Sequence, residues 1–246
     1  MLKKYLYNPK LVIKDQYLKR SHFYKNYCGD LPLFRVDSRI AISDSNPKKY
    51  MFFRIPKAAN STVISSLYFN ENKTEAKSWE DIALFKNSYS RPSQGYLKKN
   101  CLNDYFKFTI VRNPLKRCLS AYQDKILREC AQKKLVTNFL KIDAKSTVTL
   151  NQFLDFLEFG EGMCLDGHFA MQSDLCFFDI NEIDFIGKFE TLDSHIRIIL
   201  ESIYGSKYSI KSWNVHKTKN SYDIDDLSEK RIKRLYRNDY EKFEYL

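Results

Sequence analysis

Two strand–turn–helix units constrain the fold of this chain more than any other feature. The first combines an apolar strand at residues 49–55 with a helix at 61–69 whose apolar side chains lie on one face. The second combines a strand at residues 105–111 with a helix at 115–131 of the same kind. Strands that alternate with helices predict an α/β fold with a mainly parallel sheet.

Local signals indicate where the helices begin. Asn60 or Ser61 is suited to cap the first helix, and Asn113 is suited to cap the second, with Pro114 in its first turn. The other predicted elements are a short helix at 79–85, a helix that starts with the capping box of Thr149 and Gln152, a strand at 183–188, a helix from Thr191 that Gly205 ends, and a last helix from about Ser228.

The chain is long enough for one domain with a substantial core. It has 246 residues, of which 43% are hydrophobic, and this content argues against a disordered chain. We expect a single domain over residues 49–246. Residues 1–48 are polar, basic and irregular, which predicts an amino-terminal arm or peripheral element.

The net charge of +11 predicts a surface that attracts anions. Nucleotides, sulfated or phosphorylated glycans, nucleic acid and anionic lipid all fit this charge, which does not choose among them. The six cysteines form no Cys-x-x-Cys pair, so we expect no zinc site.

The turn after the first strand has the composition of an anion site. Backbone N–H groups at the start of a helix converge on one point, where the positive end of the helix dipole adds to them. It is not a Walker A loop, because no glycine lies near it, and an ordinary strand–helix connection remains the alternative. The residues that we assign to it are Arg54, Pro56, Lys57, Ala58, Ala59, Asn60, Ser61 and Thr62.

A second candidate lies at the carboxyl end of the second strand. Arg112 stands where open α/β sheets bind ligands, and an arginine can bind phosphate with two parallel hydrogen bonds. Ser120 lies two helical turns further on and can face the same crevice. The alternative is a surface arginine followed by a small helix residue.

Together, the two units resemble the nucleotide-binding signatures of the Golgi carbohydrate sulfotransferases, which include the chondroitin and dermatan 4-O-sulfotransferases and the HNK-1 sulfotransferase. The resemblance implies that residues 56–62 bind the 5′-phosphosulfate of 3′-phosphoadenosine-5′-phosphosulfate (PAPS). It also implies that residues 110–122 bind its 3′-phosphate through Arg112 and Ser120. The family usually has Asp where this chain has Asn113, which caps a helix equally well.

Three later blocks extend the resemblance over residues 50–246. Residues 166–176 are similar to the His-Trp-x-Pro-Gln region of the family, although Phe169 replaces Trp and Met171 replaces Pro. Residues 184–192 and 235–245 resemble the two blocks that follow, and all the blocks occur in order. The fold implied is a P-loop-like three-layer α/β structure with a central, mainly parallel sheet flanked by helices.

The resemblance implies a sulfotransferase that moves a sulfuryl group from PAPS to a carbohydrate hydroxyl. Lys57 would stabilise the charge that develops on the bridging oxygen, and His168 would be the base. Glu161 and Asp166 are the carboxylate alternatives, and a structural histidine is another. A nucleotide-dependent kinase of P-loop type and a non-enzymatic basic glycan-binding module are the alternative functions.

We expect metal-independent turnover, with PAPS as co-substrate and an anionic glycan or glycolipid as acceptor, and we expect no nucleic-acid partner. No apolar run approaches the roughly 20 residues of a membrane span. We therefore expect a cytoplasmic enzyme of bacterial type, and a Golgi location only if an amino-terminal anchor precedes this sequence. The oligomeric state is not predicted.

Overall fold

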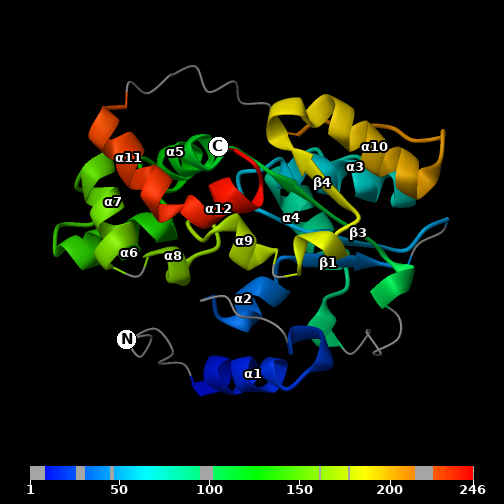
Figure 1. Cartoon of the computed structure of the whole chain (residues 1–246), viewed down its shortest axis with the longest axis horizontal. Helices are drawn as coiled ribbons and strands as arrows, with labels where there is room; N and C mark the ends of the chain where they lie inside the picture. Colours follow the sequence, from blue (N-terminus) through cyan, green and yellow to red (C-terminus); the bar gives the residue numbers. More distant parts are fainter. Residues whose placement is uncertain are drawn as a thin grey trace.

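A four-stranded sheet forms the centre of the computed structural model, which describes residues 9–25, 31–44, 47–94, 102–160, 162–176, 178–213 and 224–245. The strand order is β1-β2-β3-β4, with β1 antiparallel to β2 and with β2, β3 and β4 parallel to one another (Figure 1). The prediction of a mainly parallel sheet flanked by helices is confirmed. A P-loop-like arrangement in detail stays a prediction. The strands are β1 (Ile40–Ser43), β2 (Tyr50–Phe53), β3 (Phe106–Val111) and β4 (Phe185–Lys188).

The two central strands are buried along their whole length, which is why their sequences are almost continuously apolar. The rings of Phe52 and Phe108 stack at 4.8 Å across the β2–β3 pair. The hydroxyl of Tyr50 reaches Glu71 on one face of the sheet, and Phe53 packs against Phe178 on the other.

Helices surround the sheet and form a separate cluster beside it. The α-helices are α1 (Pro9–Lys19), α2 (Leu33–Asp37), α3 (Asn60–Asn72), α4 (Trp79–Ser88), α5 (Pro114–Lys125), α6 (Ala131–Leu140), α7 (Leu150–Phe159), α8 (Gly162–Leu165), α9 (Gln172–Leu175), α10 (Leu192–Tyr204), α11 (Asp226–Leu235) and α12 (Arg237–Lys242). Short 3₁₀ turns lie at His22–Tyr24, Pro92–Gln94, Leu102–Asp104, Ile180–Glu182 and Phe189–Thr191.

The apolar side chains form two cores. The first joins the sheet to α3, α4 and α10, and the second lies among α5, α6, α7, α11 and α12 (Figure 1). Helix α5 starts directly after β3 and belongs to the second core, so the two cores meet at the carboxyl ends of β2 and β3. The helix predicted at 115–131 extends too far, because α5 ends at Lys125 and the next helix, α6, starts only at Ala131.

The prediction that residues 1–48 are irregular is wrong for much of that segment. Strand β1 pairs with β2 from Ile40 to Ser43 and forms the antiparallel edge of the sheet. Helices α1 and α2 precede it, and Leu33 and Val36 are completely buried. The segment escapes sequence analysis because its apolar runs are short and lie among charged residues.

The capping signals are confirmed for α5 and α7 but not for α3. The Asn113 side chain accepts a hydrogen bond from the Lys116 N–H at 3.1 Å, and Pro114 is in the first turn of α5. Thr149 and Gln152 form the expected capping box of α7. Helix α3 instead begins after Ala59, so neither Asn60 nor Ser61 is its cap.

An extended segment, residues 209–213, runs antiparallel along α3, and we call it the strap. The backbone N–H and C=O groups of every second strap residue form hydrogen bonds with polar side chains that are four residues apart in α3. The pairs are Ser209 with Asn70, Lys211 with Ser66, and Trp213 with Thr62, at distances of 2.8–3.3 Å.

Candidate active site

The turn that follows β2, residues 54–59, has a backbone shaped for an anion, and we call it the Lys57 turn. Lys57 has φ 69° and Ala59 has φ 56°, in the left-handed region that costs a non-glycine residue roughly 1–3 kcal/mol. Ala59 is the N-cap of α3 and provides no side-chain hydrogen bond to it. The first N–H groups of α3 are thus left uncapped by a side chain, as an anion site at a helix start requires.

The Lys57 ammonium is held by a carboxylate on α5. Its Nζ lies 3.1 Å from Asp124 Oδ2, which also pairs with Lys125 at 3.0 Å. Burial lowers the pKa of Lys57, and the charge of Asp124 opposes this shift. Burial alone would raise the pKa of Asp124, but hydrogen bonds and charges from Lys125 and Lys57 lower it to about 2. Asp124 therefore favours the charged form of Lys57.

Arg112 lies against the Lys57 turn, as expected for two loops at one edge of a parallel sheet. Its Nη1 donates to the Lys57 carbonyl at 3.1 Å, and its guanidinium lies 4.3 Å from the centroid of the Phe189 ring. Burial lowers the pKa of Arg112, while the charge of Glu190 raises it. No carboxylate forms an ion pair with Arg112 among the residues that the structure describes.

Ser120 lies on the face of α5 that is turned to the same site. Three residues before it, Arg117 bonds to the Pro56 carbonyl, and four residues after it, Asp124 pairs with Lys57. Residues three and four apart are neighbours on a helix surface, so half-buried Ser120 lies between these two contacts.

His168 forms a dyad with Asp166. Its Nδ1 lies 2.6 Å from Asp166 Oδ1, and its backbone N–H donates to the same oxygen at 2.8 Å. Burial lowers the pKa of His168, and Asp166 only partly offsets this effect. The neutral ring donates from Nδ1 to the carboxylate and leaves the Nε2 lone pair available as a base. The carboxylate alternative Glu161 lies outside the described residues.

Two further cations of the site were not predicted from the sequence. Arg117 is 1% exposed and donates to the carbonyls of Pro56, Gly167 and Ala170. Other charged residues lie in the same helix, so the sequence does not mark Arg117 as a buried one. Lys86 reaches across from α4, and its Nζ donates to Ser61 Oγ at 3.0 Å. No local signal marks it.

The other residues assigned to the Lys57 turn have unequal access to a ligand. Arg54 is 4% exposed and donates to the Ser38 carbonyl, so it lies behind the turn. The Thr62 hydroxyl is occupied at both ends by Trp213 of the strap. Asn60 is buried, and its Oδ1 has no hydrogen-bond partner among the described residues. Ser61, beside Lys86, is the better-placed hydroxyl.

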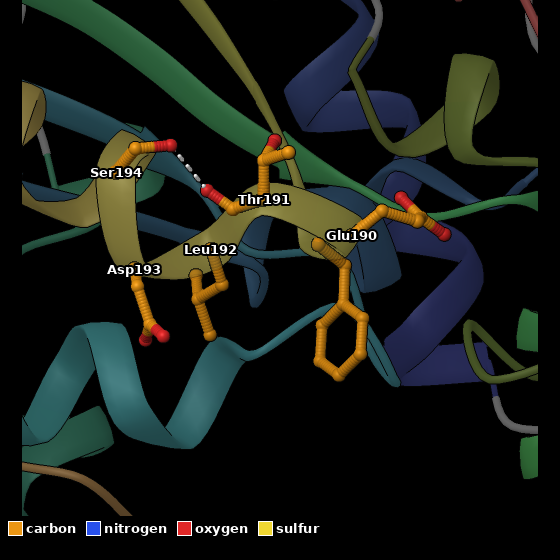
Figure 2. A pocket seen from close by; sticks show the side chains of 6 residues that line it. Glu190, Thr191, Leu192, Asp193 and Ser194 are labelled. Carbon is orange, nitrogen blue, oxygen red and sulfur yellow. Dashed lines mark hydrogen bonds between the residues drawn. The ribbon is translucent and has the colours of Figure 1, made fainter.

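A shallow hollow lies where β4 leads into α10. It has a volume of about 310 Å³, and Figure 2 shows its lining side chains on that turn. One of them, Phe189, also has the Arg112 guanidinium over its ring, so the hollow and the arginine share this neighbour. The lining residues are Phe189, Glu190, Thr191, Leu192, Asp193 and Ser194.

A comparison with protein families matches residues 39–246 to the model described as the sulfotransferase family. The chain belongs to this family. The match starts before β1, which agrees with the place of that strand in the sheet. Family membership favours a sulfotransferase over both the kinase and the non-enzymatic module.

The curated relatives of this sulfotransferase-family chain are carbohydrate sulfotransferases. It is 26% identical to human carbohydrate sulfotransferase 9 over 92% of this chain and 55% of the relative. It is 34% identical to carbohydrate sulfotransferase 14 of Danio rerio over 42% of this chain and 31% of the relative. The chain thus spans about half the length of the first relative and about a third of the second. No solved structure matches it.

The prediction of a cytoplasmic enzyme is wrong in the light of these relatives. They are Golgi carbohydrate sulfotransferases rather than cytoplasmic enzymes. Within the described residues, no helix combines the length and the apolar character needed to cross a bilayer.

Proposed function

We propose that this chain transfers a sulfuryl group from PAPS to a hydroxyl of a carbohydrate. The observation that carries the proposal is the contact of Arg112 Nη1 with the Lys57 carbonyl at 3.1 Å. It joins two cationic loops at one edge of the sheet, which supports the binding of one nucleotide across both. The carbohydrate sulfotransferases among the relatives support both the reaction and the class of acceptor.

The nucleotide would bind across both loops. We assign the 5′-phosphosulfate to the N–H groups of residues 57–62, with Lys57, Lys86 and Ser61 around it. We assign the 3′-phosphate to Arg112 and Ser120, and the adenosine to the hollow beside Phe189. The cations come from side chains, so we propose that no metal ion takes part.

His168 would activate the acceptor. Nε2 takes the proton of the acceptor hydroxyl while the acceptor oxygen forms a bond to sulfur. The bond from sulfur to the phosphate oxygen breaks, and Lys57 stabilises the negative charge on that oxygen. The products are the sulfated acceptor, 3′-phosphoadenosine-5′-phosphate (PAP) and a protonated His168, whose proton then passes to solvent. Asp166 holds the ring so that Nε2 faces the reaction.

We propose an anionic glycan or glycolipid as the acceptor. The net charge of +11 supports this class, as do the cations that lie near the base. Arg39 and Lys125 are close enough to His168 to influence its pKa. An acidic sugar would be attracted to this region.

The direct test is transfer of label from PAPS to a panel of acidic and neutral glycans. His168→Ala should lower kcat about 10²- to 10⁴-fold, the contribution of a positioned base, and leave the Kd for PAP within about twofold. Arg112→Ala should weaken PAP binding. Stabilisation by ATP but not by PAP in a thermal-shift assay would exclude PAPS as the donor. Near-normal turnover of His168→Ala would exclude His168 as the base.

A further inference from the structure

Arg117 is a fully buried cation whose hydrogen bonds, among the described residues, all go to backbone carbonyls. Its Nε donates to the Pro56 carbonyl at 3.0 Å, Nη1 to Ala170 at 2.7 Å and Nη2 to Gly167 at 3.1 Å. No carboxylate forms an ion pair with it in the described part of the chain. A buried charge is costly unless hydrogen bonds satisfy it, so these three contacts hold the guanidinium firmly.

The three carbonyls belong to the two loops that carry the reaction. Pro56 precedes Lys57 in the turn, while Gly167 and Ala170 lie on either side of His168. The guanidinium is planar and presents its N–H groups in a rigid fork. It therefore fixes the two loops relative to each other, and with them the proposed base relative to the proposed leaving group.

A second contact extends this arrangement to Arg112. The Gln172 side chain is completely buried, and it accepts from the Arg112 N–H and donates to the Arg112 carbonyl, both at 2.9 Å. The Gln172 N–H in turn donates to Asp239 of α12 at 2.7 Å. Residues 166–173, which we call the base segment, thus contact both nucleotide-binding loops.

We propose that Arg117 and Gln172 are positioning residues that hold the base segment against the two nucleotide loops. Arg117 sets the place of His168 relative to the Lys57 turn, and Gln172 sets the place of Arg112. Neither touches nucleotide or acceptor. The inference rests on the proposed function and adds to it a division of labour: Arg117 acts on the transfer step, and Gln172 on nucleotide affinity.

The first test is Arg117→Lys, which keeps the charge but loses the planar fork. A misplacement of about 1 Å can cost on the order of 10²-fold in rate, so kcat should fall about that far. The Kd for PAP should stay within about twofold, because Lys57 and Arg112 remain. Arg237→Lys, on the solvent side of α12, is the matched control and should change neither quantity.

A double-mutant comparison distinguishes positioning from a purely structural role. If Arg117 acts through His168, then adding Arg117→Lys to His168→Ala should lower kcat little further. If the fall in kcat of the double variant equals the product of the two single falls, this half of the proposal is overturned. An Arg117→Lys enzyme as fast as the wild type would also overturn it. Absence of transfer in the wild-type chain itself would instead remove the proposed function.

Gln172→Leu tests the other half and remains informative if Arg117→Lys does not fold. The backbone of Arg112 loses two hydrogen bonds, so the Kd for PAP should rise about tenfold, with kcat at saturating PAPS within about threefold. An unchanged Kd, or a fall in kcat alone, would contradict the assignment of Gln172.

Discussion

Lys86 should make PAP binding depend on pH in a way that reveals its contact with the nucleotide. Burial, with the nearby charges of Arg54, Arg39 and Lys125, lowers the pKa of Lys86 to about 8. An anion beside its Nζ would favour the charged form and raise the pKa towards the ordinary value. Binding should then be coupled to uptake of a proton by Lys86, and affinity should fall as pH rises above about 8.

The size of the effect follows from the two pKa values. At about pH 8.5, a group with a pKa of about 8 is only about one quarter protonated. If binding restores a pKa of about 10.4, the group becomes almost fully protonated and takes up about three quarters of a proton. At about pH 7 the free group is already charged, and the same calculation gives only about a tenth of a proton.

The assay is isothermal titration with PAP in buffers of different ionisation enthalpy at both pH values. Lys86→Arg should abolish the extra uptake at the higher pH, because arginine stays protonated. Lys134→Arg, on the exposed side of α6, is the matched control and should retain it. Equal uptake in wild type and Lys86→Arg at both pH values would show that Lys86 does not contact the bound nucleotide.

Four other outcomes are expected. Burial lowers the pKa of His168, and the base must be neutral, so kcat should be constant near neutral pH and fall only below about pH 6.5. A kcat that rises towards acid pH would exclude His168 as the base. Arg112→Lys should raise the Kd for PAP about 10- to 100-fold in a titration, because the variant loses hydrogen bonds to the charged 3′-phosphate. An unchanged Kd would show that Arg112 does not bind the nucleotide. Gly187→Ala would place Cβ 2.4 Å from Ile110 Cδ1, so calorimetry should show a loss of about 1–3 kcal/mol, and an unchanged Tm would contradict the tight packing. EDTA should leave turnover unchanged, and inhibition that added metal reverses would contradict the proposed metal-free mechanism.

Local sequence signals predicted the parts of the fold that local interactions determine. Asn113 with Pro114, and Thr149 with Gln152, marked helix starts because a cap needs only residues close by in the chain. The apolar runs that became β2 and β3 were identified because buried parallel strands are continuously hydrophobic. These signals also predicted that the Lys57 turn and Arg112 would meet.

Contacts between distant segments could not be predicted in this way. Lys86 and Ser61 are 25 positions apart, and Arg117 and Pro56 are 61 positions apart. Nothing in the neighbourhood of Lys86 or Arg117 distinguishes it from a solvated cation before the fold is known. The engagement of Thr62 by Trp213 was missed for the same reason, because its partner lies 151 positions away.

The strap has a consequence for how an extended chain can dock without a neighbouring strand. Alternate residues of an extended chain advance about 6.6 Å, and four residues of a helix advance about 6 Å. Because the two repeats nearly coincide, the polar side chains of Thr62, Ser66 and Asn70 can form hydrogen bonds with the backbone of every second strap residue. Inserting one residue between Ser209 and Trp213 would shift the backbone beyond the insertion, so that its N–H and C=O groups no longer face the helix side chains that bind them. This segment should therefore tolerate changes of side chain much better than changes of length.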